Sequence, residues 1–113
     1  MTRGTSPTRP PRGAIHAVTR AMAVDLGPRG VRVNTIAPGW IASDLSEGNL
    51  DSLGDPDRVA ARLTTLHPVG RVGTPQDIGD VAVFLASDRA GFLSGETTVV
   101  DGACTVKLSN PAD

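Results

Sequence analysis

Two short segments rich in β-branched residues, 31–37 and 97–100, lie far apart in this chain, and the residues between them carry helical patterns. Antiparallel strands can be joined by a tight turn, but parallel neighbours need a crossover of a dozen or more residues, usually helical. Such a crossover is almost always right-handed. The spacing therefore predicts an α/β chain whose two strands are parallel.

Three segments place apolar residues at helical spacing. The first, 13–26, is apolar over so much of its surface that a broad buried face is expected, with Gly27 ending it in a left-handed conformation. The second opens at Asp55, with proline at the first helical position, and ends before His67. The third starts at Thr74 in a pattern close to a capping box. The inward positions expected on the second and third helices are Val59, Leu63, Leu66, Ile78, Val81, Ala82 and Leu85.

The predicted order is helix, strand, helix, helix, strand. Two parallel strands make a poor sheet, because parallel sheets are normally extended on both sides and covered on both faces. No glycine-rich phosphate loop of the form G-x-G-x-x-G or G-x-x-x-x-G-K-[ST] occurs in the sequence. These two strands are therefore expected to belong to a larger sheet.

Composition narrows the classes of function. A formal net charge of −1 provides no field to attract nucleic acid or an anionic membrane. The single cysteine, Cys104, excludes an internal disulfide, suits a reducing compartment and predicts a cytoplasmic location. Residues 1–12, rich in Arg, Pro and Thr, are expected to form a disordered tail.

Five segments occur in the order and spacing of one known family. They are GAIHAVTRAMAVDL (13–26), GVRVNTIAPGWI (30–41), PVGRVGTP (68–75), VFLASD (83–88) and LSGETTVVDG (93–102). Together they make residues 13–108 resemble the C-terminal part of a classical short-chain dehydrogenase/reductase, with 109–113 as a C-terminal tail. The resemblance implies the C-terminal portion of a doubly wound, Rossmann-like parallel sheet, in which 31–37 and 97–100 would be the sixth and seventh strands.

The resemblance also implies where a nicotinamide cofactor, NAD or NADP in the intact family, would touch this chain. Pro38 and Gly39 match the segment that follows the sixth strand and lines the nicotinamide side. The main chain of Ile41 matches the position that meets the carboxamide, and Ser43 keeps the hydroxyl of a threonine that helps to hold the cofactor. Loops at the carboxyl ends of parallel strands are also where open α/β sheets bind ligands. These four residues are the candidate cofactor-binding residues.

The catalytic pair of that family is not matched. There, a tyrosine that acts as the acid/base and, four residues later, a lysine open the long helix; these positions correspond to Thr8 and Arg12. The chain contains no tyrosine, and an aliphatic hydroxyl is far too weak an acid to replace a phenol. No catalytic residue is therefore assigned. Because the glycine-rich turn is also missing, this chain alone is not expected to bind a cofactor.

No metal site is assigned either. His16 and His67 lie far apart without a matching carboxylate pattern, so they are interpreted as solvated or capping histidines. Cys104 is interpreted as an inert thiol, because no His or Asn constellation accompanies it.

Three interpretations of function remain open. The first is the C-terminal portion of an NAD(P)-dependent oxidoreductase for carbonyl/alcohol hydride transfer, from a truncated or frameshifted reading frame and inactive alone. The second is a non-enzymatic interaction module that oligomerises with an intact dehydrogenase, because the resemblance implies that 13–26 and 76–100 form subunit interfaces. The third is an enzyme split over two chains. The expected partners are a second copy or a related dehydrogenase, and neither nucleic acid nor a membrane.

Overall fold

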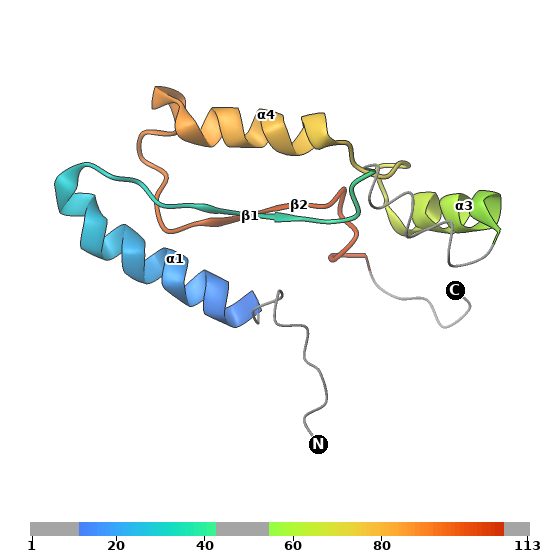
Figure 1. Cartoon of the computed structure of the whole chain (residues 1–113), viewed down its shortest axis with the longest axis horizontal. Coiled ribbons are helices and arrows are strands. Elements are labelled where there is room, and N and C mark those ends of the chain that lie inside the picture. The colour runs from blue at the N-terminus through green and yellow to red at the C-terminus, as the bar shows by residue number, and fades with distance from the viewer. Residues whose placement is uncertain (1–11, 43–54, 108–113) are drawn as a thin grey trace, which may run out of the picture. The chain divides into compact units, whose positions relative to one another are not determined.

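The computed structural model describes residues 12–42 and 55–107. Figure 1 shows the elements in the order α1 (Arg12–Leu26), η1 (Gly27–Arg29), β1 (Thr35–Pro38), α3 (Pro56–Leu66), α4 (Pro75–Ala86), η2 (Asp88–Ala90) and β2 (Thr97–Val100). Apart from the two short 3-10 turns, this is the predicted order. Arg12, which the sequence assigned to the tail, is the first residue of α1. The rest of the predicted tail and residues 109–113 lie outside the described residues.

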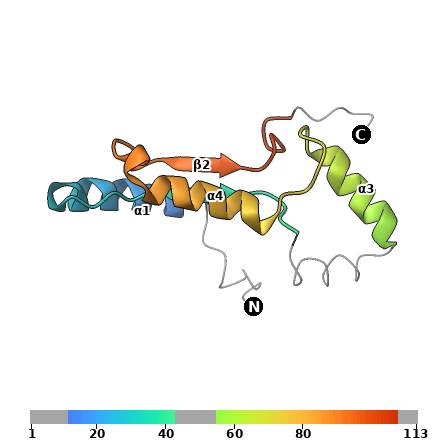
Figure 2. The same ribbon diagram turned by 90° about the horizontal axis from the view of Figure 1, so that it is seen from above.

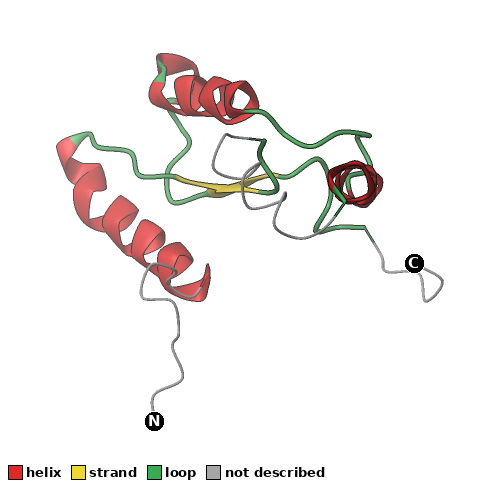
Figure 3. Ribbon diagram, turned by 45° about the vertical axis from the view of Figure 1, so that its right-hand side comes forward, coloured by secondary structure: helices red, strands yellow, loops and turns green. Residues whose placement is uncertain are grey.

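Within the described residues the two strands lie side by side as a two-stranded sheet (Figures 1 and 3). The Thr35 N–H donates to the Glu96 carbonyl at 2.9 Å, and the Gly39 N–H donates to the Val100 carbonyl at 3.0 Å. Since both residue numbers rise together, the strands are parallel, as the crossover spacing predicted. The η2 turn reverses the chain between α4 and β2 (Figure 2).

β1 is shorter than the predicted strand 31–37: it begins at Thr35 and includes Pro38. Residues 31–34 are held to the loop before β2 largely through side chains. The Val33 N–H donates to the Ser94 hydroxyl at 3.1 Å, and Asn34 Nδ2 donates to the Leu93 carbonyl at 3.0 Å. Side-chain partners interrupt the backbone ladder, so the regular strand starts only where backbone pairing becomes continuous.

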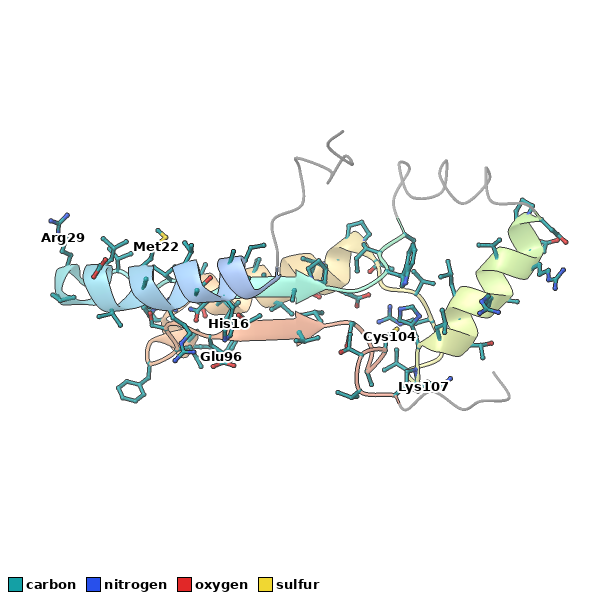
Figure 4. The ribbon with its side chains drawn as sticks, turned by 90° about the horizontal axis from the view of Figure 1, so that it is seen from below. His16, Met22, Arg29, Glu96, Cys104 and Lys107 are labelled. Carbon is teal, nitrogen blue, oxygen red and sulfur yellow. The ribbon has the colours of Figure 1, made fainter. Side chains whose placement is uncertain are left out.

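Two compact units make up the chain: Met1–Thr35 with Leu85–Thr98, and Ile36–Phe84 with Val99–Asp113. In the first unit, α1 is bonded to the start of each strand. The Thr19 hydroxyl hydrogen-bonds with the Thr35 hydroxyl, and His16 Nδ1 with Thr97 Oγ1 at 2.6 Å. His16 projects toward β2 and Met22 projects from the other side of α1 (Figure 4).

The broad buried face predicted for 13–26 is wrong. Thr19 is buried and Leu26 is half-buried, but four large apolar side chains of α1 are between 40% and 75% exposed: Ile15, Met22, Val18 and Val24. Apolar periodicity shows which residues share a helix face, but the face is buried only when another element covers it. The described residues cover α1 along the strip that carries Thr19.

The helix ends agree with the predictions from the sequence except at Gly27. Asp55 caps α3 by accepting from the Asp57 N–H at 3.1 Å, with Pro56 at the first helical position, as predicted. Gly27, however, does not take the left-handed conformation. The chain continues through η1, and Gly30 adopts it instead, with φ 78°.

The predicted inward positions of α3 and α4 are only partly buried. Leu63 is buried, and the half-buried positions are Val59, Ile78, Val81 and Leu85. Leu66 and Ala82 are exposed, contrary to prediction, because too little of the described chain packs against them. No helix within the described ranges is both long enough and apolar enough to cross a membrane.

Candidate functional site

The second unit brings the ends of β1 and β2 together at Gly39. A Cβ at Gly39 would lie 2.7 Å from Cβ and 3.0 Å from Cα of Asp101, closer than nonbonded carbon atoms approach. Only glycine lets the two backbones pass so closely. The Pro38-Gly39 segment therefore sits directly beside the first residue after β2.

After Gly39 the chain is fixed by Gly73. Ile41 and Gly73 form a parallel bridge, in which the Gly73 N–H donates to the Trp40 carbonyl at 3.0 Å and the Ala42 N–H to the Gly73 carbonyl at 2.8 Å. A Cβ at Gly73 would lie 2.6 Å from Ile41 Cδ1. Residues 40–42 are thus held as a short extended segment against the loop before α4.

A pocket of about 200 Å³ opens beside this segment, entirely within the second unit. It is lined by Trp40, Ile41, His67, Val69, Arg71, Gly73, Asp77, Val100, Asp101 and Gly102. The set combines an apolar wall with four titratable side chains. The pocket is the candidate functional site.

Asp77 is bound on two sides at the rim of this pocket. Arg71 donates to both of its carboxylate oxygens, at 2.6 and 2.9 Å. The Thr74 N–H also donates to Asp77 at 2.8 Å, while the Asp77 N–H donates to the Thr74 hydroxyl at 3.3 Å, which completes the predicted capping box. The hydrogen bonds from Arg71, and then that from the Thr74 N–H, hold the pKa of the Asp77 carboxyl well below its ordinary value.

His67 is buried, with 3% of its surface exposed, so the prediction of a capping histidine holds and that of a solvated one does not. Its N–H donates to the Thr64 carbonyl at 3.2 Å at the end of α3. Its Nδ1 lies 2.6 Å from the Leu63 carbonyl. A carbonyl only accepts, so Nδ1 carries the proton and Nε2 of the neutral ring is left with a lone pair.

Asp101 organises the turn that follows β2. Its Oδ1 accepts from the Ala103 N–H at 3.0 Å, and its Oδ2 accepts from the N–H and hydroxyl of Thr105 at 3.0 and 2.6 Å. These bonds, led by that from the Thr105 hydroxyl, lower the pKa of the Asp101 carboxyl. Lys107 ties the same turn to α3 by donating to the Thr65 carbonyl at 3.2 Å; Figure 4 labels Cys104 and Lys107 there.

Three of the four predicted cofactor-binding residues lie together. Gly39 and Ile41 are fixed as described, Pro38 is the exposed last residue of β1, and Ser43 lies outside the described residues. The sequence did not single out His67, Asp101 or the Arg71–Asp77 pair as site residues. Because Arg71 and Asp77 are only six residues apart, their ion pair could have been suggested from the sequence. No feature of the sequence near His67 indicated that it would lie beside the strand ends. No cluster suited to a metal ion occurs in the part of the chain that the structure describes.

The described residues fit only one end of a dinucleotide. The 38–42 segment can border a nicotinamide, but a pyrophosphate needs uncapped backbone N–H groups at a helix N-terminus. Both α3 and α4 begin with proline and are capped by carboxylates of their own, Asp55 and Asp77, which repel a phosphate. Neither helix therefore provides the phosphate site.

Parallel strands joined through helices, with the site at their carboxyl ends, define a portion of a Rossmann-like α/β domain. The family model described as enoyl-(acyl carrier protein) reductase matches residues 4–105, so the match begins upstream of Gly13. The chain is 45% identical over 92 residues to the short-chain reductase protein NovJ of Streptomyces niveus, covering 80% of this chain and 35% of NovJ.

Solved structures agree with this assignment. A short chain dehydrogenase family protein from Francisella tularensis is 31% identical, with a TM-score of 0.77 over 85% of this chain and 42% of that one. The 4-hydroxyisoleucine dehydrogenase complexed with NADH is 30% identical, with a TM-score of 0.74 over 85% of this chain and 38% of that one. The chain belongs to the short-chain dehydrogenase/reductase family, and it spans less than half the length of these relatives.

Proposed function

We propose that this chain is the C-terminal portion of an NAD(P)-dependent oxidoreductase that transfers hydride between the cofactor and a carbonyl or alcohol, and that the 113 residues alone are inactive. The family match over residues 4–105 supports the oxidoreductase origin. The absence of any tyrosine, together with arginine at position 12, where α1 opens, supports the inactivity. An aliphatic hydroxyl is far too weak an acid to replace a phenol, and a planar guanidinium does not reproduce the compact ammonium group of a lysine.

In a complete protein, this chain would contribute the nicotinamide end of the site. A bound NAD(P) supplies the hydride chemistry. The 38–42 segment would border the ring, and the Gly39 and Gly73 contacts would keep that segment rigid. The proton and the phosphate contacts would come from residues outside this sequence. A cytoplasmic location belongs to the same proposal and is supported by the single cysteine.

The first test is titration of the purified chain with NADH and NADPH, followed by the fluorescence of the cofactor. We expect no saturable change at micromolar protein, because neither α3 nor α4 offers a free N-terminus to the pyrophosphate. Saturable binding to this chain alone would contradict the proposal.

A chimera provides the positive test. Residues 1–12 are replaced by the N-terminal half of a close relative, including its own tyrosine and lysine. This chimera should oxidise NAD(P)H with a carbonyl substrate, and the same chimera with that tyrosine changed to phenylalanine should not. A soluble chimera that binds cofactor but turns over nothing in a broad panel would count against an oxidoreductase origin.

The second candidate function is a non-enzymatic module that associates with its own copy or with an intact dehydrogenase. The observation that favours it is the apolar surface of α1, where Val18 is 55% and Met22 is 43% exposed. Co-purification with a complete dehydrogenase would support this module. Co-purification with a polypeptide that carries only the glycine-rich half would instead support an enzyme split over two chains.

A further inference from the structure

The pocket beside Trp40 contains a buried acceptor that the nicotinamide site does not use. His67 lines the pocket, and its Nε2 is buried and accepts no hydrogen bond from the described residues. The proton on Nδ1, fixed by the Leu63 carbonyl, leaves Nε2 as an acceptor in the neutral ring. A buried acceptor of this kind is favourable only when a donor reaches it.

Gly102 lies next to this edge of the ring. It has φ 61°, and a Cβ there would lie 3.6 Å from His67 Cδ2, the carbon next to Nε2, and 2.6 Å from Val69 Cγ2. A side chain at position 102 would therefore close this edge of the pocket.

The charges on the lining favour a cation. Arg71 and Asp77 form the one ion pair found among the described residues, so their charges cancel. The Asp101 carboxylate has no cationic partner among those residues, and its three hydrogen bonds leave a lone pair on Oδ1. Trp40, which is 48% exposed, also lines the pocket, and an indole face attracts cations.

We propose that this pocket binds a small organic cation, namely a protonated primary amine on a compact apolar body. Its N–H groups donate to His67 Nε2 and to the Asp101 carboxylate, and its apolar body lies against Trp40. The volume of about 200 Å³ suits a ligand of this size and excludes a dinucleotide. The proposal goes beyond hydride transfer, and its test needs no bound NAD(P).

The test compares two probes of the same shape, tert-butylammonium and tert-butanol, added to the full chain at neutral pH. Trp40 is the only tryptophan, so its fluorescence reports on the pocket directly. The ring protons of His67 and His16 in NMR spectra provide a site and a reference in one molecule, because His16 lies on α1 in the other unit. We expect tert-butylammonium to bind about ten-fold more tightly, since charge-assisted hydrogen bonds are stronger than neutral ones. It should shift His67 and not His16.

Asp101→Asn removes the unpaired charge and should reduce tert-butylammonium binding about ten-fold without changing tert-butanol binding. The matched control is Asp80→Asn, on α4 and outside the pocket lining, which should bind both probes as the unchanged chain does. Equal affinity for the two probes, or equal shifts at both histidines, would overturn the proposal. If Asp101→Asn does not fold, the comparison of probes on the unchanged chain decides by itself.

Discussion

At the scale of single residues, replacing glycine by alanine should have opposite effects on stability at two positions of the second unit. At Gly39 an added Cβ meets Asp101, whereas at Gly79, within α4, nothing lies within 4 Å of an added Cβ. We expect Gly39→Ala to lower the free energy of unfolding by about 1–3 kcal/mol, because the strand ends must separate. Gly79→Ala should raise it by about 0.5–1 kcal/mol through helix propensity. Urea denaturation of both variants measures this, and equal effects would contradict the close approach at Gly39.

Asp77 makes the stability of the chain depend on pH in the acid range. Its pKa in the folded chain lies below the unfolded value of about 3.9, so the folded state binds fewer protons. The stabilisation is therefore complete above about pH 5 and is lost as the pH falls through the acid range. We expect the advantage of the unchanged chain over Asp77→Asn, measured by thermal melting, to shrink steadily below pH 4.

Arg71→Gln separates the two sources of this effect. It removes the largest cause of the lowered pKa but leaves the Thr74 capping box intact. Its acid dependence should fall between those of the unchanged chain and Asp77→Asn. If Arg71→Gln melts like the unchanged chain at every pH, the ion pair contributes nothing, as many exposed pairs do.

At the scale of elements, one arginine holds the end of α4. Arg32 donates to the Leu85 carbonyl at 2.8 Å, in the last turn of α4, where carbonyls lack intrahelical partners. It also donates at 3.1 Å to the carbonyl of Ser87, just after the helix, which accepts from the Ala90 N–H as well. We expect Arg32→Ala to lower the free energy of unfolding by about 1.5–3 kcal/mol, the value of hydrogen bonds to a charged group. Arg32→Lys should not restore it, because one ammonium cannot reproduce the planar fork.

The matched control is Arg29→Ala, since Arg29 is exposed and projects outward at the end of η1 (Figure 4). It should change the free energy of unfolding by less than about 0.5 kcal/mol. Denaturation monitored by circular dichroism distinguishes the two, and a similar loss in both variants would mean that net charge, rather than capping, is responsible.

At the scale of the whole molecule, the shortage of buried apolar residues predicts association. Among the described residues, Leu63 and Ala90 are the buried hydrophobic residues. Exposed apolar faces and open strand edges favour self-association. We expect light-scattering chromatography of the purified chain to give species larger than a monomer.

Adding positive charges to the exposed face of α1 should reduce this self-association. Val18→Lys combined with Met22→Lys places two charges on the exposed face, so the double variant should elute closer to the monomer than the unchanged chain. Val106→Lys, at a residue that is 76% exposed in the turn after β2, is the control and should not change association. A sharp monomer peak with cooperative melting of the unchanged chain would show the prediction to be wrong.

The sequence by itself determined the local features of this protein. The order of elements, the strand 97–100 and the capping residues Asp55 and Thr74 follow from nearest neighbours along the chain, because turns, caps and periodicity are short-range. The parallel direction of the strands followed from the length of the connection between them. Five short segments, in the order and spacing of the short-chain dehydrogenase/reductase family, also indicated the family. These features needed no knowledge of what packs against what.

Tertiary structure alone decided burial and the pocket. Periodicity could not tell that Val18 and Leu66 are exposed, since burial depends on whether another element covers a face. It could not place His67 beside Asp101 either, because residues distant in sequence meet only when the backbones approach. That approach depends on the missing side chain at Gly39, whose consequence appears only when Asp101 is beside it. The site is therefore a property of the packed strand ends and not of any one segment.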